Sequence, residues 1–247
     1  WITSKVVFDK LLTADGSLAV NGVQLAESYS VGKDGMSVSF TLKDGLTWHD
    51  GSALTVADIE WSVKTALRVP NIHSVVSNTF KSIEGGQEYS DGSSDEIAGI
   101  TTDGNTITFS MAVLDPNMLL TFTQFPPLPM AHLKDVDPLQ LQQAAYWQKP
   151  IGSGPFKIEE VQMNDFVRYV PFENYHGGVA QIDEIVAWPS LDGDGNLLKN
   201  AGAGRMDYGF TKNVADVGAL EAMDNMRVVA ADIPYTRMIW FNKFARK

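Results

Sequence analysis

The residues best suited to acid–base or metal chemistry are four histidines, the only ones in this 247-residue sequence. They are His49, His73, His132 and His176. A zinc-binding pair on one helix would be four residues apart, and none of these histidines has such a neighbour. A lone histidine is most often a surface residue or a hydrogen-bonded core residue. The spacing therefore predicts no metal centre built from histidines.

Two glycine-containing stretches match functional loops only in part. Ser153 lies between two glycines, but a nucleophile elbow needs glycine two residues before and after the serine, where Ile151 and Pro155 stand. Residues 202–207 begin like a dinucleotide-binding loop, but Asp207 occupies the position of the third glycine. We therefore predict no catalytic residue and no cofactor.

An acidic stretch near residue 194 has part of the pattern of a calcium loop. Asp192, Asp194 and Asn196 have the spacing of its first three ligands, but Leu197 and Ala203 replace the required glycine and glutamate. The sequence thus favours a helix start over a metal site. A carboxylate pair for glycoside hydrolysis stays an open alternative, because the chain has 30 acidic residues and spacing alone selects none of them.

The composition is typical of a globular protein with an acidic surface. Apolar residues make up 44% and charged residues 20% of the sequence, the net charge is −11, and cysteine is absent. Nucleic acids and anionic membranes attract clustered positive charge, so we expect neither as a partner. Without cysteine there is no disulfide framework and no thiolate nucleophile.

Two parts of the sequence could belong to a targeting signal or a membrane-spanning helix, namely the start of the chain and one run without charged residues. The sequence begins at Trp1 without an initiator methionine, which indicates a processed or trimmed chain. Residues 116–133 carry no charged side chain but contain four prolines, which would break a membrane-spanning helix.

Apolar spacing and turn residues predict a mixture of helices and strands, hence an α/β or α+β fold. A capping box at Thr55 and Asp58 predicts a helix start. Residues 84–96, rich in acidic residues, glycine and serine, are predicted to form a solvated loop. We also expect a helix over 6–12, strands over 36–42, 156–161, 166–172, 208–210 and 237–242, and a hairpin over 100–109.

Two groups of motifs together resemble a known family. The first reads LAESY at 25–29, FTLKDGLTWHDG at 40–51 and LTVADI at 54–59. The second reads PIGSGPF at 150–156, FENYHGG at 172–178 and IDEI at 182–185. In order and separation they resemble the signature of family 5 extracellular solute-binding proteins, the oligopeptide, dipeptide and nickel receptors of ABC importers. One departure is His176, where the family more often has tryptophan.

The resemblance implies a periplasmic-binding-protein-like fold of type II, in the mixed α/β and α+β class. By that mapping, residues 1–22 and 152–247 belong to domain I, and residues 23–151 form an inserted domain II. The third domain, which closes on the ligand, would be absent, so the chain would be a fragment.

The resemblance also implies a function. The protein would be an extracytoplasmic receptor, in the periplasm or on the surface of a bacterium, that delivers a peptide or another small molecule to an ABC permease. It would be a monomer and no enzyme, attached to a membrane only through an anchor that this chain lacks, as in a lipoprotein. Open alternatives are a nickel chelate, haem or oligosaccharide as ligand, a hydrolase with cleft carboxylates, or a sensor that lost transport.

Site residues follow from the same mapping. Tyr208, Phe210 and Thr211 occupy a segment that resembles one lining the family's cleft, and Trp240 is a further candidate. The glycines of the PIGSGPF motif are expected to be structural. Gly152 and Gly154 are predicted to take positive φ where the chain crosses back from the inserted domain.

Overall fold

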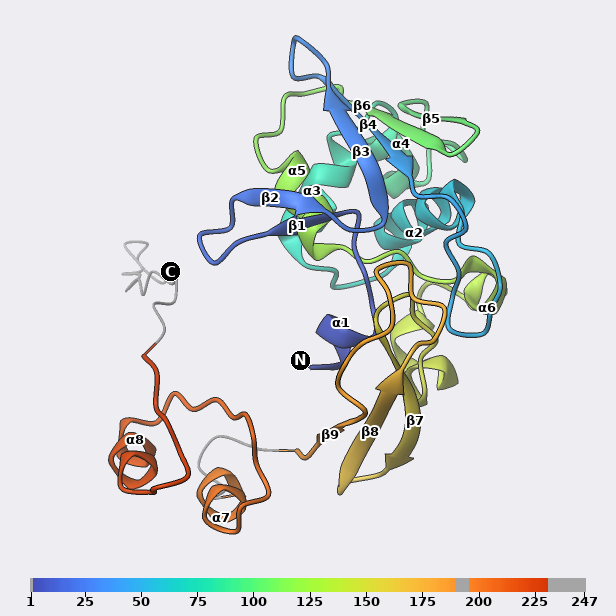
Figure 1. The fold of residues 1–247 in the computed structure, drawn as a ribbon. Coiled ribbons are helices and arrows are strands. Elements are labelled where there is room, and N and C mark those ends of the chain that lie inside the picture. Colours follow the sequence, from blue (N-terminus) through green and yellow to red (C-terminus); the bar gives the residue numbers. More distant parts are fainter. Residues whose placement is uncertain (1, 190–195, 231–247) are drawn as a thin grey trace, which may run out of the picture. The chain divides into compact units, whose positions relative to one another are not determined.

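The structure is a computed structural model that describes residues 2–189 and 196–230. The chain forms two compact units, Trp1–Trp188 and Pro189–Lys247. Figure 1 shows both, with residues 196–230 of the second unit coloured orange to red.

A four-stranded antiparallel sheet with the order β3-β4-β6-β5 organises the larger part of the first unit. The predicted strand and hairpin are confirmed, because β4 alternates buried and half-buried side chains and Gly104 turns between β5 and β6 at a φ of +55°. The strand bounds are Ala26–Val31 (β3), Ser37–Leu42 (β4), Ile100–Asp103 (β5) and Thr106–Ser110 (β6).

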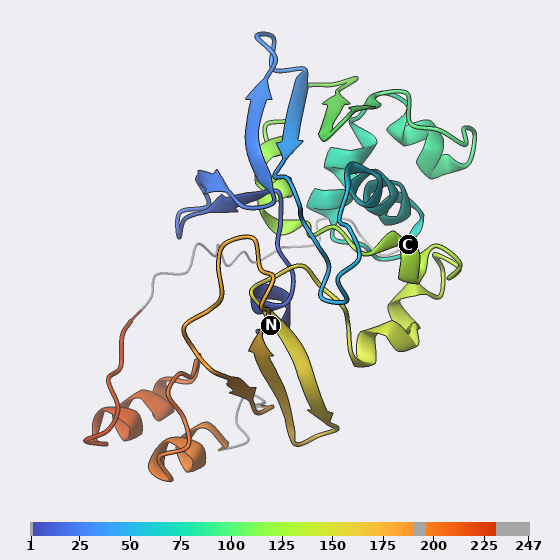
Figure 2. The same cartoon turned by 45° about the vertical axis from the view of Figure 1, so that its right-hand side comes forward.

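Helices cover this sheet and complete its core, as Figure 2 shows beside the blue strands. The predicted capping box is confirmed at the start of α2, where the Asp58 carboxylate accepts the backbone N–H of Thr55 at 2.9 Å. In the core, the rings of Phe40 and Phe122 meet edge-on with centroids 4.8 Å apart. The helix bounds are Val56–Arg68 (α2), Ser74–Lys81 (α3), Gly86–Asp91 (α4) and Met118–Gln124 (α5).

The prediction of a loop over residues 84–96 was wrong, because α4 lies within it. Gly85 and Gly92 flank this helix, with φ of +79° and +78°. The glycines that signalled a loop thus cap the two ends of a short helix. Both have the left-handed backbone conformation, which glycine adopts at little steric cost.

The prediction of a helix over residues 6–12 was also wrong. Helix α1 covers Thr3–Val6, and the chain then extends into β1 (Leu12–Ala14), which pairs with β2 (Val20–Val23). The extended segment, visible between α1 and β1 in Figure 1, buries neighbouring side chains in two different cores. Val7 and Phe8 enter a small core, and Leu11 and Leu12 enter the large one, which a helix could not achieve.

The small core lies against an antiparallel sheet of three strands in the order β7-β8-β9. The predicted pairing of strands near 156–161 and 166–172 is confirmed. Short helical turns precede this sheet. The bounds are Phe156–Gln162 (β7), Phe166–Pro171 (β8), Ile185–Ala187 (β9), Met130–Leu133 (α6), Leu141–Gln143 (η1) and Ala145–Gln148 (η2).

Within residues 196–230, the described part of the second unit, the chain forms the helices α7 (Asn196–Gly202) and α8 (Val214–Glu221). The strand predicted at 208–210 does not form, and these residues are irregular. The strand predicted at 237–242 lies outside the described residues. Among the helices that the structure describes, none combines the length and the apolar character that a bilayer crossing requires.

The structure gives a different reason for the glycines of the PIGSGPF motif than the predicted positive φ. Gly152 and Gly154 are not among the described glycines with positive φ. Instead, both glycines pack directly against the backbone of residues 6–8. A Cβ on Gly152 would overlap the carbonyl oxygen of Val7, and one on Gly154 would lie 2.5 Å from the carbonyl oxygen of Val6. Close approach of two backbones therefore requires glycine here.

We predict that Gly152→Ala destabilises the protein by about 1–3 kcal/mol, because a methyl group at this position forces the backbones apart. The measurement is the denaturant midpoint of unfolding. The matched control is Gly16→Ala, since a Cβ on Gly16 meets no atom within 4 Å. Equal midpoints for the two variants would contradict the close-approach explanation.

Candidate functional site

Three segments far apart in the sequence meet at a buried joint, which we define as Val7, Asp9, His49, Gly152 and Gly154. The backbone N–H of Gly154 donates to the carbonyl of Val7 at 2.8 Å, and the N–H of His49 donates to the carbonyl of Gly152 at 2.9 Å. The joint therefore connects the start of the chain, the end of the motif over residues 40–51 and the predicted crossing at residues 152–154.

His49 uses both ring nitrogens in this joint. Its Nδ1 accepts the N–H of Gly152 at 3.2 Å, so Nε2 carries the proton and donates to the carbonyl of Gly154 at 2.9 Å. The ring also meets Phe172 edge-on, with centroids 5.0 Å apart. His49 thus holds the crossing in the neutral form, and it has no free nitrogen for a metal or a proton transfer.

Burial lowers the pKa of His49, an effect that the Gly154 carbonyl and the charges of Asp9 and Asp50 oppose and the charge of Lys157 reinforces. Since the folded-state pKa lies below the ordinary value of 6.5, the unfolded chain takes up the proton first. The stability that neutral His49 contributes is complete above pH 6.5 and is lost as the pH falls towards the folded-state pKa.

The carboxylate of Asp9 is completely buried and accepts three side-chain hydrogen bonds. Oδ1 accepts from Nε2 of Gln24 at 2.6 Å, and Oδ2 accepts from the hydroxyl of Tyr175 at 3.0 Å and from Nε2 of His176 at 2.8 Å. A buried carboxylate is tolerated only with such partners. Burial, and next the Asp9 charge, raise the pKa of Tyr175, so its hydroxyl stays a donor.

Neighbouring Lys10 binds backbone oxygen atoms. Its Nζ donates to the carbonyls of Ser4 at 2.8 Å and Phe8 at 2.6 Å, and burial lowers its pKa to about 8. This lysine closes the end of α1, where carbonyl groups lack helical partners.

His176 connects the joint to a polar hollow. Since Asp9 holds Nε2, the other ring nitrogen, Nδ1, lies 3.4 Å from Nζ of Lys43. The polar hollow has a volume of about 790 Å³. It is lined by Glu27, Thr41, Leu42, Lys43, Asp44, Gly45, Asn105, Thr106 and His176. Its lining offers both acidic and basic groups.

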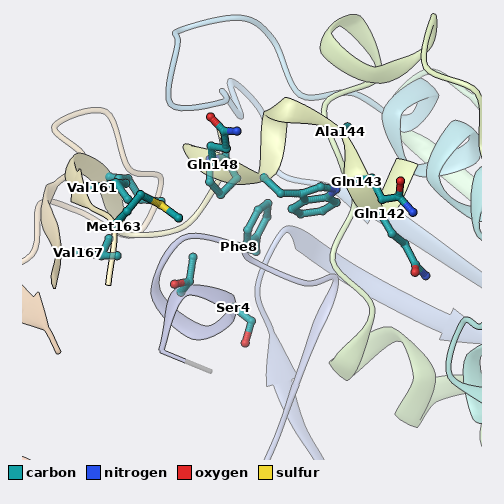
Figure 3. A pocket seen from close by; sticks show the side chains of 13 residues that line it. Ser4, Phe8, Gln142, Gln143, Ala144, Gln148, Val161, Met163 and Val167 are labelled. Carbon is teal, nitrogen blue, oxygen red and sulfur yellow. The ribbon is translucent and has the colours of Figure 1, made fainter. Parts of the chain in front are cut away.

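A second hollow, of about 640 Å³, has a lining without any charged side chain, which Figure 3 shows. Phe8 and Trp147 are among the residues that line it, and their ring centroids are 6.5 Å apart. The indole N–H of Trp147 donates to the carbonyl of Leu141, so the ring offers an apolar surface. Gln143 and Gln148 add amide groups. This uncharged hollow can accept apolar or neutral polar groups.

The predicted ligand-binding residues lie in the second unit. Tyr208 is 72% and Phe210 55% exposed, which leaves both rings free to contact a ligand. Thr211 is half-buried, and its hydroxyl donates to Asp216 at 2.8 Å and accepts the N–H of Asn213 at 3.0 Å. Both hydrogen bonds of this hydroxyl therefore stabilise the start of α8. Trp240, the fourth predicted residue, lies outside the described residues.

In the part of the chain that the structure describes, no three histidine, aspartate or glutamate side chains are grouped to hold a metal ion. The structure instead brings together residues that sequence reasoning did not connect, above all Asp9, Tyr175 and His176. The signal for Asp9 was available, since it is the single acidic residue in an otherwise apolar and basic run over residues 5–12.

Comparison with known proteins decides the family. The sequence model described as "Bacterial extracellular solute-binding proteins, family 5 Middle" matches residues 23–244. The chain belongs to family 5 of the bacterial extracellular solute-binding proteins. The family predicted from the motifs is thereby confirmed.

A relative from Brucella ovis, provisionally named as an ABC transporter peptide-binding protein, is 25% identical over 237 residues. The match covers 96% of this chain and 42% of the relative. The chain thus spans less than half the length of this curated relative.

Solved structures confirm the predicted type II fold. The lactococcal oligopeptide-binding protein OppA, solved with an endogenous peptide in a closed conformation, superimposes with a TM-score of 0.73 at 22% identity, over 87% of this chain and 41% of OppA. NikZ from Campylobacter jejuni, solved with Ni(L-His), gives a TM-score of 0.71 at 19% identity, over 89% of this chain and 40% of NikZ.

We predict that His49→Gln destabilises the protein by about 1–3 kcal/mol at pH 7.5, because buried backbone groups of the crossing lose a partner. The free energy of unfolding of the variant should also fall less below pH 6.5 than that of the parent, because the imidazole whose protonation opposes folding has been removed. Denaturant unfolding at several pH values measures both effects.

The matched control for this prediction is His73→Gln, which removes an exposed histidine. It should keep the parental stability and the parental pH dependence. If His49→Gln also follows the parental curve at every pH, the described role of His49 is contradicted.

Proposed function

We propose that the protein to which this chain belongs is the peptide receptor of an ABC importer. The observation that carries the proposal is the family match over residues 23–244, joined to a fold shared with a peptide-bound OppA. The Brucella relative's name supports a peptide over other ligands. Such a receptor works as a monomer on the extracytoplasmic side and delivers its ligand to a permease.

The proposed activity is binding without catalysis. In a receptor of this kind, two lobes close on the ligand and exclude water. An extended peptide is bound mainly through its backbone, whereas roomy, hydrated pockets accept varied side chains. The family is one of solute-binding proteins, which supports a role without turnover.

We also propose the domain division, with residues 1–22 and 152–247 in domain I and residues 23–151 in an inserted domain II. The small core supports the pairing of the two domain I segments, because it combines Val7 and Phe8 with residues of β7 and β8. The large core is built mostly from residues 25–122 and also takes in Leu11 and Leu12 of the first segment.

The test is to purify the longer natural protein without denaturation, extract the bound molecules and identify them by mass spectrometry. The proposal expects a mixture of short peptides in nearly equimolar amount. A single nickel chelate, haem or oligosaccharide as the bound molecule would overturn the peptide assignment, and reproducible hydrolysis of a bound substrate would overturn the receptor assignment.

Within this proposal, Tyr208 and Phe210 contact the ligand. We predict that Tyr208→Ala or Phe210→Ala in the longer protein weakens peptide binding about tenfold, because an aromatic contact contributes about 1–1.5 kcal/mol. Calorimetry with the peptides found by mass spectrometry measures it. Val214→Ala is the control, since Val214 is 84% exposed in the same unit. Unchanged affinity in both aromatic variants would remove these residues from the site.

A further inference from the structure

We propose that the polar hollow of the first unit binds a carboxylate group, held between Nζ of Lys43 and Nδ1 of His176. The two nitrogens are 3.4 Å apart and both belong to residues that line the hollow. This proposal does not depend on the ligand contacts proposed at Tyr208 and Phe210, which belong to the second unit.

The orientation of His176 carries the first part of the argument. Its side chain is 12% exposed, and Nε2 donates to Oδ2 of Asp9, which is itself completely buried. Tyr175 and Gln24 fix the same carboxylate with their own hydrogen bonds. The ring is therefore held with Nδ1 directed at Lys43, so the lysine side chain has to move aside to admit a ligand while the ring stays in place.

Proton counting carries the second part. With Nε2 donating to Asp9, neutral His176 has only a lone pair at Nδ1, which accepts from Lys43. A carboxylate that enters between these groups needs donors on both sides. His176 then takes up a proton at Nδ1, and its second N–H and the ammonium of Lys43 each donate to one carboxylate oxygen. Asp9 stabilises the resulting imidazolium, so binding is coupled to the uptake of one proton.

The other charges of the lining select the kind of anion. Glu27 lines the hollow with an exposed carboxylate, and Asp44 accepts the side-chain N–H of Asn105 at 2.8 Å. These two negative charges oppose a doubly charged phosphate more strongly than a singly charged carboxylate. They also favour a ligand that carries a positive charge near its carboxylate, as a short peptide or an amino acid does.

The experiment is calorimetry of this chain with glycylglycine, its C-terminal amide, acetate and inorganic phosphate, each in two buffers of different ionisation enthalpy at pH 7.5. We expect glycylglycine to bind at about millimolar affinity with net proton uptake, and the amide at least tenfold more weakly. If acetate binds with the same affinity as glycylglycine, the site is one for small organic acids. If acetate binds more weakly, the site is one for peptide termini. Both results support a carboxylate site.

Variants locate the binding. Lys43→Met should weaken glycylglycine at least tenfold, and His176→Gln should abolish the proton uptake. Lys33→Met is the matched control. Lys33 lies in the turn between β3 and β4, outside the hollow, whereas Lys43 directly follows β4. It should leave the affinity within twofold of the parent.

Three results would overturn the proposal. They are equal binding of glycylglycine and its amide, tighter binding of phosphate than of either carboxylate, and unchanged affinity in Lys43→Met. The comparison of the acid with the amide uses the unaltered chain, so it stays decisive even if His176→Gln disturbs folding around Asp9.

Discussion

The first unit depends on one buried carboxylate, that of Asp9. An ionised group without water is costly unless each oxygen has donors, and Asp9 has them from Gln24, Tyr175 and His176. Gln24 directly follows β2, and Tyr175 and His176 lie in the loop after β8, so satisfying a single side chain fixes two distant parts of the chain against the extended segment that precedes β1. Losing any one of these donors would remove a hydrogen bond from a buried carboxylate, and this free-energy penalty stabilises the native contacts around Asp9.

The segment that carries Asp9 also packs closely against another part of the backbone. The segment that carries Asp9 lies so near residues 152–154 that Gly152 and Gly154 leave no room for a Cβ. His49 then satisfies the backbone of the crossing with both ring nitrogens. The buried crossing at residues 152–154 packs against the segment that leads from the small core to the large core, and the polar hollow is lined by His176, which binds Asp9 of that segment.

Sequence patterns predicted local structure where local interactions decide it. The capping box of Thr55, the alternation over residues 37–42 and the family motifs all held, since each reflects neighbouring residues. The helix over 6–12 failed because its apolar side chains serve two cores, a long-range fact that spacing cannot show. The grouping of Asp9 with Tyr175 and His176 joins residues more than 160 positions apart. The motifs named the family, but only the structure brought Lys43 to His176.

The most direct test of this account is the free energy of unfolding of Asp9→Asn, measured by denaturant titration beside Asp103→Asn, which alters an exposed aspartate on β5. Asparagine has nearly the same shape, so the variant removes the charge and one acceptor from the buried cluster. The account predicts a loss of about 3 kcal/mol for Asp9→Asn and less than about 0.5 kcal/mol for the control. Equal stabilities of the two variants would contradict the claim that the buried carboxylate holds the first unit together.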